Sequence, residues 1–164
     1  MAAEASKHQN PRKKPRPSLR REGREAALQF LFSHDLNPEL NPDGPEAVDF
    51  WNLRSAKPRV REFATELLRG LMPHLTEIDE RIATASENYA LQRLAAVDRN
   101  LLRLAVYEIL FRDDIPAPVS INEAVEIAKD FGTEESPKFV NGLLDRIRKE
   151  SLPPPGESPS STDF

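Results

Sequence analysis

The chain has 164 residues, a formal net charge of −4 and an apolar share of 38%, which suits one folded domain with polar ends. It contains no cysteine, which excludes disulfides and thiolate metal sites. No apolar run approaches the roughly 18 residues that span a bilayer, and the N-terminus lacks a hydrophobic signal core, so we expect a cytoplasmic protein.

The charge is distributed unevenly along the chain. Residues 1–24 hold eight Lys and Arg against two Glu, a net +6, so the remaining residues carry −10. Residues 1–17 mix three prolines with Lys, Arg and Gln and bury too little apolar surface to fold alone, so we predict a disordered basic arm. Two interpretations of this arm remain open: it neutralises nucleic-acid phosphates, or it only solubilises the chain.

Helical patterns begin after the arm. Ser18 is predicted to cap a helix that extends to about His34, and the inward face of this helix is expected to hold Ala27, Leu28, Leu31 and Phe32. A loop rich in Pro, Asn and Gly follows at residues 37–45. Further helices are predicted at 46–53, at 60–71 and at 75–85.

Starts of the later helices are less clearly marked. The helix at 75–85 is expected to begin at Pro73 or to be capped by Thr76, and Asp98 is a candidate cap for a helix carrying Leu101 to Leu110. A connector with two prolines follows at residues 113–118.

The last helical third has the strongest local signals. Ser120 and Glu123 fit a capping box at the start of a helix, and Gly132 is expected to end that helix in the left-handed conformation. Ser136 is predicted to cap the next helix with Pro137 in its first turn. Residues 152–164, rich in Pro and Ser, are predicted to be a disordered tail.

These patterns together predict the fold class. No segment alternates apolar and polar residues as a half-buried strand would, and six or seven amphipathic helices with short links favour an all-α bundle. We therefore predict one helical domain over residues 18–151.

Sequence signals of catalysis and metal binding are missing. His8, His34 and His74 are far apart and lack ligand spacing, and none of the six glycines opens a phosphate loop. No serine lies in a recognisable nucleophile motif. We expect neither enzymatic activity nor a metal or cofactor.

Three segments carry a family resemblance when taken together. They are the arginine-rich first helix RREGREAALQFLFSHDL, the middle segment VDRNLLRLAVYEILFRDDIP, and SINEAVEIAKDFG followed by KFVNGLLD. In this order and spacing they resemble the NusB family of small helical RNA-binding transcription factors, over about residues 20–147.

The resemblance implies a fold, a function and partners. The fold would be two packed three-helix units. The function would be transcription antitermination through boxA-type RNA, a short single-stranded element early in ribosomal RNA transcripts. The partners would be NusE, a small-subunit ribosomal protein, together with other Nus factors and RNA polymerase.

Candidate RNA-binding residues come partly from the residues and partly from the resemblance. Arg20, Arg21 and Arg24 lie at i, i+1 and i+4, so at least two share a helix face, and cations at a helix start oppose the helix dipole. Guanidinium groups grip phosphates and stack on bases. The resemblance adds further candidates at Phe32, Lys138 and Phe139.

Several of these positions have an ordinary structural interpretation as well. Phe32 and Phe139 fit either a stacking role or the core. Asp98 and Glu135 match acidic family positions on the partner side, although Asp98 equally fits a helix cap.

Two other functions remain open. One is a helical interaction module without RNA binding. The other is a stand-alone relative of the RNA-binding domain found in RNA cytosine methyltransferases, but no Gly-rich cofactor loop follows here. Members of the family that the chain resembles occur as monomers and as dimers, so the oligomeric state stays open.

Overall fold

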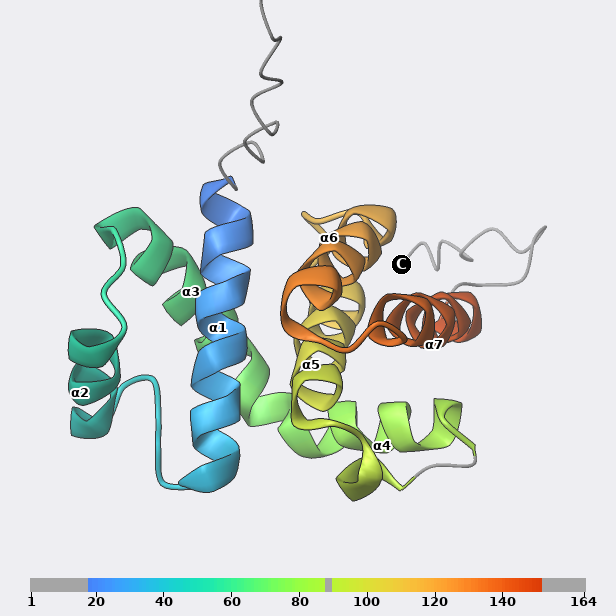
Figure 1. Cartoon of the computed structure of the whole chain (residues 1–164), viewed down its shortest axis with the longest axis horizontal. Coiled ribbons are helices and arrows are strands. Elements are labelled where there is room, and N and C mark those ends of the chain that lie inside the picture. The colour runs from blue at the N-terminus through green and yellow to red at the C-terminus, as the bar shows by residue number, and fades with distance from the viewer. Residues whose placement is uncertain (1–17, 88–89, 152–164) are drawn as a thin grey trace, which may run out of the picture.

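The computed structural model describes residues 18–87 and 90–151, and these residues form helices without a β-strand (Figure 1). In chain order they are α1 (Leu19–Leu36), α2 (Pro45–Leu53), α3 (Pro58–Leu71), η1 (Met72–His74), α4 (Leu75–Ala85), η2 (Leu91–Arg93), α5 (Ala96–Phe111), α6 (Ala117–Phe131) and α7 (Ser136–Ser151). The predicted all-α bundle of about seven helices is confirmed. The predicted arm at 1–17 and tail at 152–164 lie outside the described residues. Within the described part of the chain, no helix is long and apolar enough to cross a bilayer.

Helix α5 lies at the centre of the bundle. It contacts α1, α3, α4, α6 and α7, and every residue from Leu101 to Glu108 is buried. A helix that is apolar on nearly all sides is expected in such a position. In Figure 1, α1, α2 and α3 lie to the left of α5, α7 lies to its right, α6 overlaps α5 in this view, and α4 lies below.

Helix starts follow the predictions only in part. The backbone N–H of Arg21 donates to Ser18 Oγ at 3.1 Å, so the predicted cap of α1 is confirmed. The predicted caps at Thr76 and Asp98 are wrong, because His74 and Ala95 hold those positions and both predicted residues lie inside the first turn. Helix α4 needs no capping side chain, since η1 leads into it directly.

The predicted capping box of α6 is also wrong. The helix begins at Ala117 after Pro116, three residues before Ser120. Pro118 suits the first turn of this helix because its missing N–H would have no helical partner there. The Ser120 hydroxyl instead donates to Glu108 Oε1 of α5 at 3.2 Å, so it serves a contact between helices.

The turn between α6 and α7 is tight for a steric reason. Gly132 has φ −94° and ψ −168°, so the predicted left-handed conformation is wrong. A Cβ at Gly132 would lie 2.5 Å from Ser136 Oγ and 2.9 Å from the Ala128 carbonyl oxygen. Ser136 is the first residue of α7, and its Oγ accepts the Thr133 N–H at 2.9 Å. Glycine is therefore required here by space.

A network of charged side chains joins α1, α4 and α5. Asp35 accepts hydrogen bonds from Arg99, Asn100 and Arg103 at 2.8–2.9 Å. Arg103 also forms two hydrogen bonds with Asp79 of α4, at 2.7 and 2.9 Å. Burial alone would raise the pKa of Asp35, but these three donors outweigh it and hold that pKa below the ordinary 3.8.

Replacing Asp35 with Asn is expected to lower the free energy of unfolding by about 2 kcal/mol at pH 7, since charge-assisted hydrogen bonds are lost. A lowered pKa stabilises the fold above the unfolded-state value, and this contribution disappears as pH falls through the folded-state value. The deficit of D35N should thus be complete at pH 7 and shrink below pH 3.8. Urea unfolding at pH 7 and at about pH 3 measures it, and an equal deficit at both would contradict the assignment.

Candidate nucleic-acid interface

The three candidate arginines of α1 are each held by a different helix. Arg20 is exposed, and its guanidinium carbon lies 5.6 Å from the ring centre of Phe63 on α3. Arg21 binds Glu123 of α6, and Arg24 binds Glu108 of α5. The first turns of α1 therefore contact α3, α5 and α6.

Arg24 is enclosed in the core. Its side chain is 3% exposed and that of Glu108 is 1% exposed. Arg24 Nη2 lies 2.6 Å from Glu108 Oε1, and Arg24 Nε lies 3.0 Å from Oε2. RNA contact by Arg24 would leave this carboxylate buried without its cation, so the geometry speaks against direct RNA contact by Arg24, whose predicted RNA-binding role stays a prediction.

Arg21 is half-buried beside a carboxylate. Its Nε donates to Glu123 Oε2 at 2.8 Å and its Nη2 donates to Oε1 at 3.0 Å. Hydrogen bonding to Glu123 raises the pKa of Arg21 above its ordinary value. Arg24 Nη1 lies 4.0 Å from Glu123 Oε2, so both guanidinium groups adjoin one carboxylate.

Phe63 was not predicted as part of the site. A Cβ at Gly23 would lie 2.5 Å from Phe63 Cδ1. The missing side chain lets α3 approach α1 closely, and the ring then lies under Arg20, with the guanidinium carbon of Arg24 5.7 Å from its centre. Cation–π attraction of this kind orders an exposed arginine.

A hollow of about 430 Å³ lies where α1, α2 and the end of α6 meet. Phe32 is 42% exposed and Phe131 is 38% exposed on its lining. The inward orientation predicted for Phe32 is wrong, because Phe30 is the fully buried phenylalanine of α1. The other lining residues are Leu28, Gln29, Ser33, Phe50, Leu53, Arg54 and Val97.

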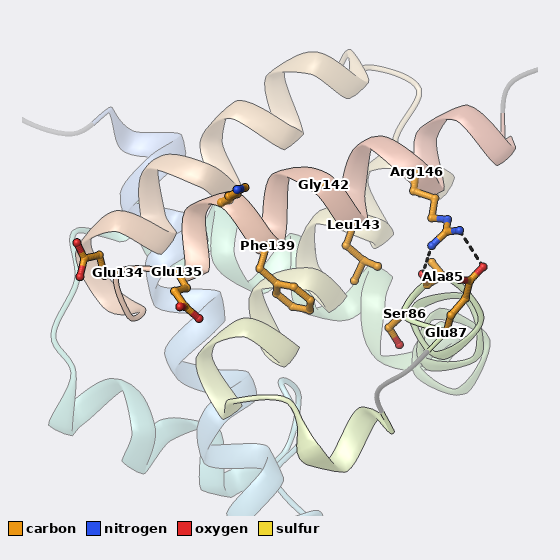
Figure 2. Close-up of a pocket in the computed structure, with 10 residues that line it drawn as sticks. Ala85, Ser86, Glu87, Glu134, Glu135, Phe139, Gly142, Leu143 and Arg146 are labelled. Carbon is orange, nitrogen blue, oxygen red and sulfur yellow. Dashed lines mark hydrogen bonds and ion pairs between the residues drawn. The ribbon is translucent and has the colours of Figure 1, made fainter.

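A larger open hollow of about 830 Å³ lies between α7 and the end of α4 (Figure 2). Phe139 and Leu143 point into it from α7, and Glu134 and Glu135 lie at one end. At the other end Arg146 donates to the Ala85 carbonyl oxygen at 3.0 Å and to Glu87 Oε1 at 2.8 Å. Lys138, Ser86 and Gly142 complete the lining.

The two hollows adjoin the same turn. Phe131 lines the smaller hollow, and Glu135, after the turn, lines the larger one. Phe32 thus lies in a hollow at the end of α6, whereas exposed Lys138 and half-buried Phe139 line a separate hollow at the start of α7, more than 100 residues later in the sequence. Helix α6 leads from this turn back to Glu123 and Arg21.

Asp98 lies in the first turn of α5, next to Val97 of the smaller hollow. Asp98 is 9% exposed, and its Oδ1 has no hydrogen-bond partner within the described residues. Buried carboxylate oxygens normally accept a hydrogen bond, so Asp98 Oδ1 is a buried acceptor without a partner among the described residues.

This surface combines cations with aromatic rings, and the carboxylates of Glu123, Glu134 and Glu135 lie among them. Across residues 18–87 and 90–151, no three His, Cys, Asp or Glu side chains are grouped to hold a metal ion. Guanidinium and ammonium groups bind phosphates, and exposed phenyl rings stack on bases. Nucleic acid has phosphates that bind cations and bases that stack on rings, so it is the ligand class that this combination favours.

Comparison with known sequences gives consistent matches. A sequence model described as "NusB family" matches residues 21–149. The transcription antitermination protein NusB of Geobacter sulfurreducens is 48% identical over 140 residues, which cover 84% of this chain and 98% of that protein. The NusB of Desulfitobacterium hafniense strain DCB-2 is 51% identical over 129 residues, covering 78% of this chain and 86% of that protein.

Solved structures resemble the fold over a similar length. T. maritima NusB superposes with a TM-score of 0.70 at 43% identity, over 82% of this chain and 93% of that one. A structure described as antitermination factors NusB and NusE in complex with dsRNA also gives a TM-score of 0.70, at 29% identity over 80% of this chain and 97% of that one.

Proposed function

Because the chain belongs to the NusB family, we propose that it acts in the cytoplasm as a transcription antitermination factor that binds boxA-type single-stranded RNA together with NusE. The observation that supports this most is the placement of Phe32, Lys138 and Phe139 in two hollows beside the α6–α7 turn. In this function the protein suppresses premature termination of ribosomal RNA transcription, within an assembly of other Nus factors and RNA polymerase.

The proposed RNA surface has a cationic end and an aromatic end. At the cationic end, Arg20 and Arg21 bind phosphates from the first turn of α1. At the aromatic end, Phe32 and Phe139 line separate hollows, and each hollow has room for a base stacked on the ring. Lys138 adds a phosphate contact beside Phe139.

Stacking on exposed rings favours single-stranded RNA, because bases within a duplex are already stacked on each other. The solved relative is described as a complex with double-stranded RNA. A duplex of the same sequence therefore belongs in the test of this proposal.

Asp98 and Glu135 are the proposed contacts to NusE. Asp98 is 9% exposed and its Oδ1 is buried, so NusE would contact Asp98 only through the exposed part of this side chain. Glu135 is exposed at the end of the larger hollow, beside the proposed RNA surface. This location allows the partner and the RNA to bind side by side.

The test is fluorescence anisotropy of a labelled boxA-type RNA titrated with the full chain, alone and with NusE. A scrambled RNA and the boxA duplex serve as controls. We expect the boxA single strand to bind most tightly and to bind more tightly still with NusE. Equal affinity for all three RNAs, with or without NusE, would leave a helical interaction module as the better description.

A further inference from the structure

Glu123 occupies the Nε/Nη2 edge of the Arg21 guanidinium, one of the two edges that can bind a phosphate with paired hydrogen bonds, and neutralises the charge of Arg21. We infer that Glu123 competes with RNA phosphate for the guanidinium of Arg21 and so limits the affinity of this chain for RNA. The inference rests on the proposed RNA-binding function. It concerns the strength of binding, which the fold and the candidate surface leave open.

The competition follows from the geometry of the ion pair. Arg21 uses Nε and Nη2 together, at 2.8 and 3.0 Å from the two oxygens of Glu123. A guanidinium binds the oxygens of a phosphate with the same planar pair of donors. While Glu123 holds this pair, Arg21 keeps only Nη1 and the second N–H of Nη2 for a phosphate, and its positive charge is already neutralised by Glu123.

Exchange between the two anions is physically accessible. The Arg21 side chain is 29% exposed, so a phosphate reaches it without unfolding α1. Glu123 retains a cationic neighbour after Arg21 leaves, because Arg24 Nη1 lies 4.0 Å from its Oε2. This second guanidinium reduces the penalty of leaving the carboxylate half-buried.

Arg20 provides the contrast within the same helical turn. It is exposed and lies over the uncharged ring of Phe63, and although Asp114 is near enough to feel its charge, Arg20 forms no ion pair within 4 Å among the described residues. In the wild-type chain Arg20 binds phosphate directly, whereas Arg21 binds it only by exchange with Glu123. Removal of the competing carboxylate should therefore add about one complete phosphate contact.

The test measures RNA affinity of full-length Glu123→Gln at several salt concentrations. We expect binding to tighten by about three- to tenfold, as for one charge-assisted contact. The slope of log K against log salt should steepen by about 0.7, the value for one phosphate on a single strand. A residue that only supported the fold would not steepen this slope.

The matched control is Glu126→Gln, one turn further along α6. It removes the same charge, but Glu126 pairs with Lys129 at 2.7 Å and acts on Arg21 only through space, without a hydrogen bond. A general decrease in negative charge would therefore act similarly in both variants, whereas competition for Arg21 acts mainly in E123Q. Circular dichroism confirms that each variant remains helical.

The double variant R21A/E123Q isolates the role of the arginine. We expect the gain of E123Q to disappear when Arg21 is absent. If the gain persists, or if E123Q binds RNA no more tightly than the wild type, the inference is overturned while the proposed function stands. If neither the wild type nor any variant binds RNA, the proposed function fails, and the inference fails with it.

Discussion

Replacing Arg24 with alanine is expected to lower the free energy of unfolding by about 3–5 kcal/mol, which is the usual effect of removing one partner of a buried ion pair. The variant would leave Glu108, 1% exposed, without its guanidinium partner deep between α1, α5 and α6. Ser120 alone would remain as a donor to that carboxylate at 3.2 Å among the described side chains. Urea unfolding followed by circular dichroism measures the loss.

The control is Arg21→Ala in the same helix. Its ion pair with Glu123 is more exposed, 29% and 16% for the two side chains, so we expect a loss of roughly 1 kcal/mol or less. The double variant R24M/E108L should recover most of the stability lost in R24A, since both charges are then replaced by apolar groups. A loss in R24A no larger than that in R21A would show that Glu108 finds another partner.

The two arginines therefore contribute to different properties although both belong to the first turns of α1. Arg24 holds the start of α1 against α5 through its ion pair with Glu108. Arg20 and Arg21 lie on the resulting framework, closer to solvent. A triple alanine variant would combine loss of fold stability with loss of RNA contacts, so single variants are needed to separate the two effects.

Apolar spacing was sufficient to predict the helices. In α3 the apolar residues that predicted the helix are Val60, Phe63, Ala64, Leu67, Leu68 and Leu71, and all of them except half-buried Phe63 are 2% exposed or less. Burial of a stripe at helical spacing is the dominant source of stability for such helices. This spacing involves only residues of one helix, so it can be recognised from the sequence alone.

Polar side chains were harder to assign, because their partners are distant in sequence. Ser120 and Glu123 match a capping box by spacing alone. In the folded chain Ser120 binds Glu108 and Glu123 binds Arg21, 102 residues away. A local pattern gives no information on such partners, and the helix start moved to Pro116 and Ala117 instead.

The burial of Arg24 had one detectable signal. Glu108 interrupts the apolar run of α5, with Tyr107 before it and Ile109 after it. A carboxylate in such a helix requires a buried cation or donor. Nothing in the sequence shows that this cation comes from α1, because the pairing depends on how α1 and α5 pack.

Phe32 was expected on the inward face of α1 but is exposed, which is the reverse of Arg24. Phe30 and Phe32 are two positions apart, so they point about 200° apart around the helix axis and only one can face the core. Phe30 is fully buried, which places Phe32 on the wall of the hollow shared with Phe131. An exposed phenyl ring contributes little to the fold, and this makes Phe32 a clean probe of RNA binding.

Phe32→Ala is expected to weaken binding of the boxA-type single strand by about 1–3 kcal/mol, the range for loss of one base–aromatic stack, or roughly 5- to 150-fold in Kd. The salt slope should stay unchanged, because no charge is removed. Leu36→Ala, one turn further along α1 and 78% exposed outside the hollow lining, is the matched control and should bind as the wild type does. Anisotropy titrations at two salt concentrations measure both variants. A folded F32A protein with wild-type affinity would assign the ring to packing against Phe131, and the bases would then have to stack at Phe139.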